Sequence, residues 1–237
     1  RDFTTKLHLK LYDIGCGVCH QVILENGHVL PGDLVLGADS HTCTYGALGA
    51  LSTGVGSTDL AITLACGKNW FRVPESIKII VKGSIPKGVG AKDIILSIIK
   101  DLRADGATYK CVEFGGPVIK KLSLDQRFTI CNMAVELGAK FGVMEPDEAV
   151  YRFLKGRTKR TFVPQFCDKH ARYEFVREYD ISKLSPQIAK PHNVDNVCDV
   201  GQVEGTVINQ AYLGTCTNGR LEDLKIAASV VKGKVIH

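Results

Sequence analysis

The sequence predicts an α/β protein with parallel or mixed sheets, because short apolar segments with strand-like patterns alternate with amphipathic segments at helical spacing. Of its 237 residues, 45% are hydrophobic and 23% are charged, which is typical of a globular protein with one large or two smaller cores. No stretch approaches the roughly 18 consecutive apolar residues that a membrane span requires. We therefore expect an α/β protein that does not interact with a membrane.

The first half of the chain is expected to form two strands and two helices. The first helix has Ser57 as its expected N-cap and Gly67 as its stop. The second helix has isoleucines at helical spacing and an expected stop at Gly106. In order, the segments are the strand "GDLVLGAD" (32–39), the helix 57–66, the strand "SIKIIVKG" (76–83) and the helix 91–105.

The second half continues this alternation but contains one long irregular stretch. Ser123 and Gln126 form a capping-box pattern at the start of one helix, and Pro146 marks the start of another. The stretch 156–195 has mixed charge, several prolines and no clear period, so loops are expected there. The other expected elements are a strand in "YKCVEFGG" (109–116), a strand in "FGVM" (141–144), and a strand, a tight turn and a helix in 205–233.

Three parts of unequal size are expected along the chain. The composition shifts near Pro74 and again across the polar stretch from Pro186 to Pro191. The chain also starts without Met and stops just after an apparent helix, so we expect it to be truncated at both ends. The expected parts are the end of a first domain (1–74), a second α/β domain (75–190) and the beginning of a third α/β domain (191–237).

Cysteine content and net charge restrict the compartment and the partners. The nine cysteines are an odd number at irregular spacing, and no secretory signal precedes them, so a reducing cytoplasm is expected rather than a disulfide framework. The net charge of +5 is modest, with basic and acidic residues interspersed and no basic stripe. Nucleic-acid binding is therefore not expected.

The segment "CGVCH" has the C-x-x-C-H pattern of a c-type haem attachment site, from Cys16 to His20. Haem attachment needs an oxidising compartment and a second axial ligand, and the sequence indicates neither. A zinc site would need a second pair of ligands, and the chain has no other C-x-x-C. The simplest interpretation is that Cys16 and Cys19 are two packed thiols, which leaves His20 as the informative residue.

The segment "GADSHTCTYG" places Asp39, Ser40 and His41 in the turn after an expected strand. At the strand ends of an α/β sheet such turns present functional groups. A carboxylate beside an imidazole can set its tautomer and raise its basicity, which suits a general acid or base. On an extended chain Asp39 and His41 would share one side and Ser40 would face the other. The alternative is a capped turn in which Asp39 and Ser40 satisfy backbone donors.

Cys216 lies in the turn "LGTCTNGR", just before an expected helix. Backbone N–H groups and the helix dipole at this position favour a thiolate, which is the form of cysteine that binds iron or attacks electrophiles. The alternative is a free cysteine in a turn.

Glu113 is a charged residue near the end of the apolar strand "YKCVEF", beside a Gly-Gly turn. A solvated residue at a strand end is the commoner case for such a position. The alternative is a carboxylate that pairs with an imidazole.

The order of these motifs resembles that of the aconitase superfamily. The resemblance rests on "CHQVILENG", "PGDLVLGADSHT", "GALGALSTGVGSTDLA", "VEFGGP", "TICNMAVELGAKFGVMEPDE" and "GTCTNGRLEDL", and it covers most of the chain apart from about residues 156–190. It implies aconitase-like α/β/α domains and a hydro-lyase that moves a hydroxyl group by dehydration and rehydration. Isopropylmalate, an intermediate of leucine biosynthesis, is the substrate expected from the resemblance, with homocitrate as the alternative.

The resemblance also implies an iron–sulfur centre. It makes Cys216 the first ligand of a [4Fe–4S] cluster whose other two cysteine ligands would lie beyond the end of this chain. One iron would be left open as a Lewis acid for the hydroxyl and carboxylate of a small hydroxy-acid substrate.

The acid–base groups implied by the resemblance form two histidine–carboxylate pairs. His20 is paired with Asp39, and His41 is paired with Glu113. Ser40 is expected to face a substrate carboxylate. Two such pairs could protonate the leaving oxygen while a metal binds it.

A separate partner is implied as well. In this family a serine on a swivelling domain removes the proton next to the carboxylate, and in split enzymes that domain is a small subunit. We find no candidate for that domain in this chain, so a small subunit is the expected partner. Some relatives of aconitase bind RNA as regulators, but the modest charge argues against that here. A salt-dependent gel shift with structured RNA would decide the point.

Overall fold

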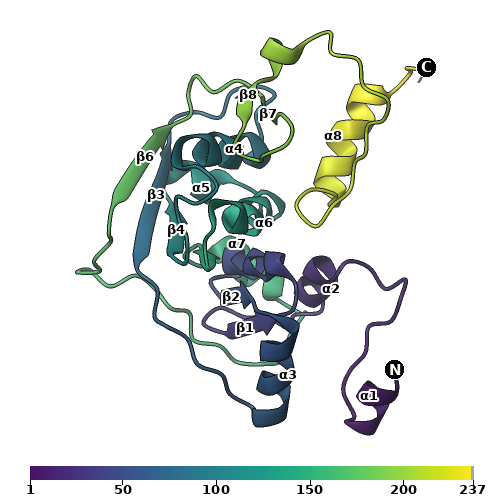
Figure 1. The fold of residues 1–237 in the computed structure, drawn as a ribbon, viewed down its shortest axis with the longest axis vertical. Helices are drawn as coiled ribbons and strands as arrows, with labels where there is room; N and C mark the ends of the chain where they lie inside the picture. Colours follow the sequence, from purple (N-terminus) through teal and green to yellow (C-terminus); the bar gives the residue numbers. More distant parts are fainter. Residues whose placement is uncertain (236–237) are drawn as a thin grey trace.

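The computed structural model describes residues 1–235, and its central feature is a four-stranded parallel sheet (Figure 1). Across the sheet the strands are β5 (Phe141–Val143), β4 (Cys111–Gly115), β3 (Ser76–Lys82) and β6 (Val176–Asp180). In β3, Ile77, Ile79 and Val81 are fully buried, whereas the residues between them are partly exposed. β4 alternates in the same way at Val112 and Phe114. This one-sided burial places the main core on one face of the sheet.

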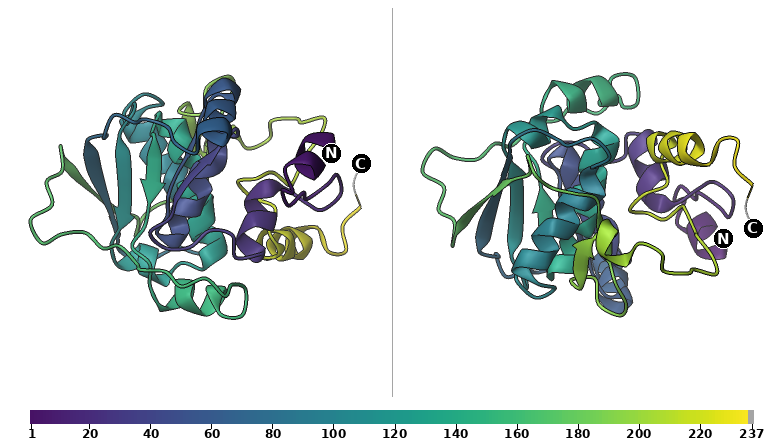
Figure 2. Two further views of the ribbon diagram at one scale, coloured as in Figure 1. Left: turned by 90° about the horizontal axis from the view of Figure 1, so that it is seen from below. Right: turned by 90° about the horizontal axis from the view of Figure 1, so that it is seen from above.

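Helices that follow β3 and β4 in sequence cover this face (Figure 2). They are α4 (Ala91–Leu102), α5 (Pro117–Lys121) and α6 (Leu124–Asn132), with a 3₁₀ helix, η2 (Met133–Leu137), after α6. α4 buries its four isoleucines, as their helical spacing predicted. It ends before the expected stop at Gly106, with Arg103 at a φ of 71°. α6 begins as predicted, with the Gln126 N–H donating to the Ser123 hydroxyl.

A smaller layer precedes the main sheet in sequence. The strands β1 (Leu34–Gly37) and β2 (Leu51–Gly54) form a parallel pair, and the 3₁₀ helix η1 (Ser40–Leu48) connects them. The helices α2 (Cys19–Glu25) and α3 (Ser57–Cys66) flank this pair in sequence. α3 stops at Gly67 as predicted, but Gly56 rather than Ser57 is its N-cap.

A close backbone contact joins the two layers. A Cβ atom at Gly46 in η1 would lie 1.7 Å from the carbonyl oxygen of Gly142 in β5, and Cβ atoms essentially never approach within 3.0 Å of another heavy atom. The Gly46 carbonyl also accepts a hydrogen bond of 3.0 Å from the N–H of Met144. Glycine is therefore required at this position for η1 to pack directly against the sheet.

The expectation of loops in 156–195 is only partly correct. β6 forms inside this stretch as an edge strand that pairs with β3, and β7 (Gln187–Ala189) pairs antiparallel with β8 (Val197–Asp199). The strand expected after Gly205 is not formed. After the 3₁₀ helix η3 (Val200–Val203), the chain is irregular, with Val207 and Tyr212 exposed.

The three-part division of the chain stays a prediction. The β7–β8 pair crosses the expected boundary at 190, and one continuous core joins residues on both sides of 74. The last two residues of the expected third part lie outside the described residues. One hydrophobic core thus includes residues of the sheet, of its helices and of the β1–β2 layer.

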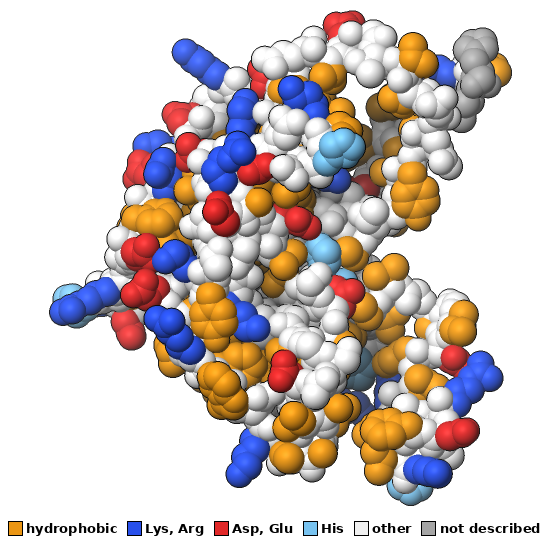
Figure 3. All heavy atoms as spheres, in the orientation of Figure 1, with side chains coloured by type: hydrophobic (Ala, Val, Ile, Leu, Met, Phe, Trp, Pro, Cys, Tyr) orange, Lys and Arg blue, Asp and Glu red, His pale blue; other side chains and the backbone are white. Residues whose placement is uncertain are grey.

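Three further helices complete the fold: α1 (Asp2–Lys6), α7 (Glu148–Leu154) and α8 (Leu221–Val231). α8 buries none of its residues 221–231 and exposes large apolar side chains such as Leu221, Ile226 and Val230. In the space-filling view a hollow separates the region of α8 from the N-terminal segment (Figure 3). Among residues 1–235, no helix is both long and apolar enough to cross a membrane.

Candidate active site

His20 and Asp39 form a hydrogen-bonded pair between α2 and the turn after β1. The Nε2 atom of His20 is 2.9 Å from Oδ1 of Asp39, so the predicted pairing is confirmed. Nδ1 of the same ring is 3.1 Å from the hydroxyl oxygen of Tyr45 in η1. His20 is only 2% exposed, and this burial lowers its pKa even though the hydrogen bond with Asp39 opposes the shift. The His20 ring is therefore neutral at pH 7.

Asp39 serves both as a helix cap and as a partner of His20. The chain enters η1 at Ser40, so the extended conformation expected for "DSH" is wrong. Asp39 is the N-cap, and its Oδ1 accepts a hydrogen bond of 2.7 Å from the N–H of His41. Partial burial raises the pKa of Asp39, but the hydrogen bonds from His20 and His41 outweigh it and lower the pKa overall. Asp39 is therefore an ionised carboxylate.

His41 is paired with Glu136 in η2, which corrects the predicted pairing with Glu113. The Nε2 atom of His41 is 3.4 Å from Oε1 of Glu136, and Nδ1 is 3.2 Å from the Ser40 hydroxyl and 3.6 Å from Asp39 Oδ1. The hydrogen bond to Glu136 raises the pKa of His41 and lowers that of Glu136. The imidazolium form of His41 is therefore favoured, whereas the ring of His20 is neutral.

Glu113 lies on β4, where it binds a different set of residues. Its Oε1 is 2.7 Å from Nζ of Lys78, the neighbour in register on β3, and its Oε2 accepts a hydrogen bond of 2.5 Å from the Tyr173 hydroxyl. Tyr173 also lies 2.9 Å from the thiol of Cys167. These contacts fasten the loop before β6 to the sheet. Lys78 is the partner of Glu113 because the two residues are in register on neighbouring parallel strands. The pattern of a single strand does not reveal this register.

The loop that carries Cys216 packs against α6 through polar contacts. The Thr217 hydroxyl donates to Oδ1 of Asn132 at 2.7 Å, and the Thr217 carbonyl accepts from Thr129 at 2.9 Å. Nη1 of Arg220 donates to the same carbonyl at 3.1 Å. Nδ2 of Asn132 in turn donates to Thr44 of η1 at 2.8 Å. Asn132, fully buried, therefore connects the Cys216 loop with the helix that begins at Ser40.

The sequence analysis assigned no role to Tyr45, Asn132 or Glu136. Asn132 and Glu136 belong to the segment "TICNMAVELG", in which two polar residues four positions apart interrupt an apolar helix pattern. Residues at this spacing share one helix face. That spacing was a signal that could have identified both residues as lining a polar site.

The candidate residues line two cavities that share Cys216. Cys216 and His20 line a cavity of about 310 Å³ together with Arg220, and Cys216 and His41 line another of about 750 Å³ together with Glu136. Among residues 1–235, no group of three or more His, Cys, Asp or Glu side chains is arranged to hold a metal ion. The half-buried thiol of Cys216, which lines one cavity with His20 and another with His41, fits one ligand position of a metal centre.

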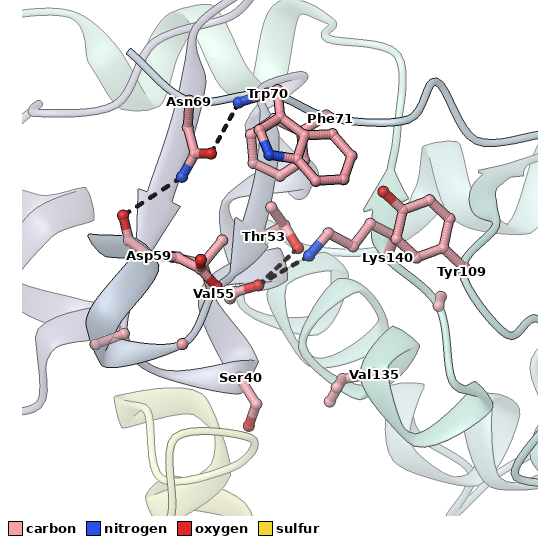
Figure 4. Close-up of a pocket in the computed structure, with 14 residues that line it drawn as sticks. Ser40, Thr53, Val55, Asp59, Asn69, Trp70, Phe71, Tyr109, Val135 and Lys140 are labelled. Atoms are coloured by element: carbon pink, nitrogen blue, oxygen red, sulfur yellow. Dashed lines mark hydrogen bonds between the residues drawn. The ribbon is translucent and has the colours of Figure 1, made fainter. Parts of the chain in front are cut away.

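Ser40 lies at the rim of a separate cavity of about 500 Å³ (Figure 4). Lys140 reaches into this cavity, where its Nζ donates to the carbonyl of Gly54 at 3.2 Å. The rings of Phe71 and Tyr109 lie near the same ammonium group, with centroids at 5.5 and 5.8 Å. Burial lowers the pKa of Lys140. The Ser40 hydroxyl can therefore contact a ligand that enters from this side.

The His41–Glu136 pair predicts a specific pH dependence of stability. The raised pKa of His41 adds stability that is complete below its ordinary value of 6.5 and is lost as the pH rises through the raised value. The lowered pKa of Glu136 adds stability that is present above 4.5 and is lost as the pH falls through the lowered value. The stability difference between wild type and Glu136→Gln, measured by urea unfolding, should thus be largest between about pH 4.5 and 6.5.

The size of this difference is limited because both side chains are partly exposed, so at most about 1 kcal/mol is expected. Asn196→Asp is a useful comparison, since it changes one charge far from His41 in the sequence and should show a different pH profile. A difference for Glu136→Gln that grew steadily above pH 7 would contradict the pairing.

Comparison with known proteins gives one family for the whole chain. The family model described as "Aconitase family (aconitate hydratase)" matches residues 1–237. The chain is 51% identical, over 95% of its length, to the 3-isopropylmalate dehydratase large subunit 1 of Methanopyrus kandleri, and this match covers 54% of that protein. It is 56% identical, again over 95% of its length, to a probable methanogen homoaconitase large subunit of Methanosarcina mazei, with 58% of that protein covered.

A third relative is the 3-isopropylmalate dehydratase large subunit 2 of Archaeoglobus fulgidus, which is 52% identical over 99% of the chain and is covered over 56% of its length. The chain thus spans a little more than half the length of the curated relatives it matches.

Proposed function

Since this chain belongs to the aconitase family, we propose that it forms the large, catalytic part of a hydro-lyase that converts 2-isopropylmalate to 3-isopropylmalate by dehydration and rehydration. The observation that carries this proposal is the convergence of two histidine–carboxylate pairs and a loop cysteine from four separate segments. Loss of a hydroxyl group needs a proton donor and a group that binds the leaving oxygen. The names of two of these relatives support isopropylmalate as the substrate.

In this proposal His41 is the proton donor. Its Nε2–H is held by Glu136, and the second ring nitrogen, Nδ1, lies beside Ser40 and Asp39. In the imidazolium form Nδ1 carries the proton that the departing hydroxyl oxygen takes up, so that water leaves. On rehydration the neutral Nδ1 takes a proton back from water. The raised pKa of His41 keeps the charged form populated near neutral pH.

Asp39 and Ser40 are proposed to bind and orient the substrate. Asp39 uses Oδ1 for His20 and for the N–H of His41, and its side chain is 53% exposed. The Ser40 hydroxyl, at the rim of the cavity in Figure 4, is placed to donate to a substrate carboxylate. A substrate held by both residues would present its hydroxyl group to Nδ1 of His41.

Cys216 is proposed as one ligand of an iron–sulfur centre. When bound, a [4Fe–4S] cluster with one open iron supplies a Lewis acid for the hydroxyl and carboxylate oxygens of the substrate. The chain contributes a thiol whose loop is held by a hydrogen bond donated to Asn132 and by hydrogen bonds accepted from Thr129 and Arg220. These bonds fix the direction from which the thiol meets a metal.

We expect Cys216→Ser to lose bound iron, because a serine hydroxyl is a much weaker ligand for iron than a thiolate. The measurement is the iron and sulfide content per chain after anaerobic reconstitution. Cys66→Ser, at the exposed end of α3, is the control and should keep the wild-type content. Equal iron content in Cys216→Ser and wild type would remove Cys216 from the ligand set.

A small subunit is proposed as the partner, supported by the "large subunit" in the names of the relatives. The decisive assay uses the full-length protein with reconstituted iron and sulfide, mixed with a small subunit, and follows the unsaturated intermediate by its ultraviolet absorbance. Turnover of isopropylmalate is the expected result. Turnover of homocitrate in its place would transfer the proposal to the activity named for the Methanosarcina mazei relative. Turnover of neither compound would contradict the proposal.

A further inference from the structure

Tyr45 is a buried residue of η1 that the proposed chemistry does not use. It is 2% exposed, and its hydroxyl lies 3.1 Å from Nδ1 of His20, with the two ring centroids 5.5 Å apart. Among residues 1–235 this is the one hydrogen bond that the Tyr45 hydroxyl makes to another side chain. Burial raises the pKa of Tyr45, so its oxygen keeps its proton. A phenol in such a place has one proton to donate and one direction in which to donate it.

The other nitrogen of His20 determines which way this bond runs. Asp39 is ionised, and an ionised carboxylate only accepts hydrogen bonds, so the proton between the two residues belongs to Nε2 of His20. In a neutral imidazole the remaining nitrogen, Nδ1, is then an acceptor. The Tyr45 O–H is therefore the donor. If Nδ1 were also protonated, it could no longer accept this hydrogen bond. The buried Tyr45 O–H would then lose its acceptor, which is costly inside the core.

We propose that Tyr45 is a positioning residue for the His20–Asp39 pair: its hydroxyl donates to Nδ1 of His20 and keeps the imidazole proton on Nε2, where it is donated to Asp39. The catalytic consequence rests on the proposed function. His20 then orients Asp39 and transfers no proton itself, which leaves proton transfer to His41 and Glu136. The two histidines of the site thus have different roles because their rings meet different groups: Nδ1 of His20 meets the Tyr45 hydroxyl, whereas Nε2 of His41 meets the Glu136 carboxylate and its Nδ1 lies beside Ser40.

The test is a long-range ¹H–¹⁵N correlation spectrum of the protein labelled with ¹⁵N in its seven histidines, which distinguishes protonated from unprotonated ring nitrogens. His20→Gln identifies the His20 signals. We expect a protonated Nε2 and an unprotonated, hydrogen-bonded Nδ1 in the wild-type protein. This spectrum needs no enzymatic activity, so it tests the tautomer even if the proposed reaction is wrong.

Tyr45→Phe keeps the ring and removes only the hydroxyl group. We expect the Nδ1 signal of His20 to shift while the signals of the other histidines stay in place, and kcat to fall by about tenfold with little change in KM, the size expected for one lost hydrogen bond to a positioning group. The control is Tyr179→Phe, which removes a hydroxyl bonded to Asp101 at 2.7 Å and should leave the His20 signals unchanged.

Two results would overturn the proposal. A protonated Nδ1 in the wild-type spectrum would mean that Tyr45 accepts the bond, and this result can be read even if Tyr45→Phe fails to fold. Unchanged His20 signals in a folded Tyr45→Phe protein would show that the hydroxyl does not determine the tautomer. Absence of turnover by a wild-type protein with the expected tautomer would count against the proposed function and not against the role of Tyr45.

Discussion

Replacing His41 by Ala should lower kcat by about 10²- to 10⁴-fold, the usual contribution of a general acid, while the bound iron stays at the wild-type level. The reason is that His41 is the histidine of the site whose pKa is raised and whose Nδ1 lies beside Ser40 and Asp39. The side chain is partly exposed, so its removal should leave the fold intact. The measurement is the rate of formation of the unsaturated intermediate, together with iron content and circular dichroism.

Two glutamate variants distinguish the observed pairing from the one expected from the sequence. Glu136→Gln removes the carboxylate at 3.4 Å from His41 and should lower kcat. It should also shift the alkaline limb of the pH–rate profile, where the imidazolium form is lost, to lower pH, because the pKa of His41 would fall toward its ordinary value. Glu113→Gln weakens the contact with Lys78 and should change thermal stability more than kcat. A larger loss of kcat in Glu113→Gln than in Glu136→Gln would contradict the site described above.

Gly46→Ala should destabilise the fold by at least about 3 kcal/mol, the upper range for forcing extra volume into a packed core. Its Cβ would lie 1.7 Å from the carbonyl oxygen of Gly142, and both atoms belong to backbone that cannot turn aside as a side chain can. Relief of this overlap requires η1 to move away from β5. Because η1 begins at Ser40, that movement should also displace His41 from Glu136 and reduce activity in any folded fraction.

Urea unfolding measures this effect, and Gly201→Ala is the matched control. A Cβ at Gly201 meets no atom within 4 Å, so the same substitution there should change the free energy of unfolding by less than about 1 kcal/mol. Similar stabilities of Gly46→Ala and Gly201→Ala would show that η1 and β5 are not packed as tightly as the structure has them.

Local patterns in the sequence were sufficient for most of the elements around the site. The alternation in "SIKIIVKG" predicted β3, and the isoleucine spacing predicted α4. Gly67 ends α3, as expected. The irregular stretch before Pro186 hid β6, because an edge strand with exposed residues lacks an apolar period. The strand expected in 205–213 did not form, since strand propensity alone does not supply a neighbouring strand to pair with.

The sequence by itself identified the candidate residues for the proposed chemistry: His20 with Asp39, His41 beside Ser40, and Cys216 in its turn. The tertiary structure decided which groups meet, because partners from distant segments are selected by packing and register. Because η1 packs against α6 and η2, His41 pairs with the carboxylate of Glu136. Because β3 and β4 are paired in register, Glu113 forms its ion pair with Lys78. Burial of Tyr45 against His20, which no local pattern indicates, gave the two histidines different environments.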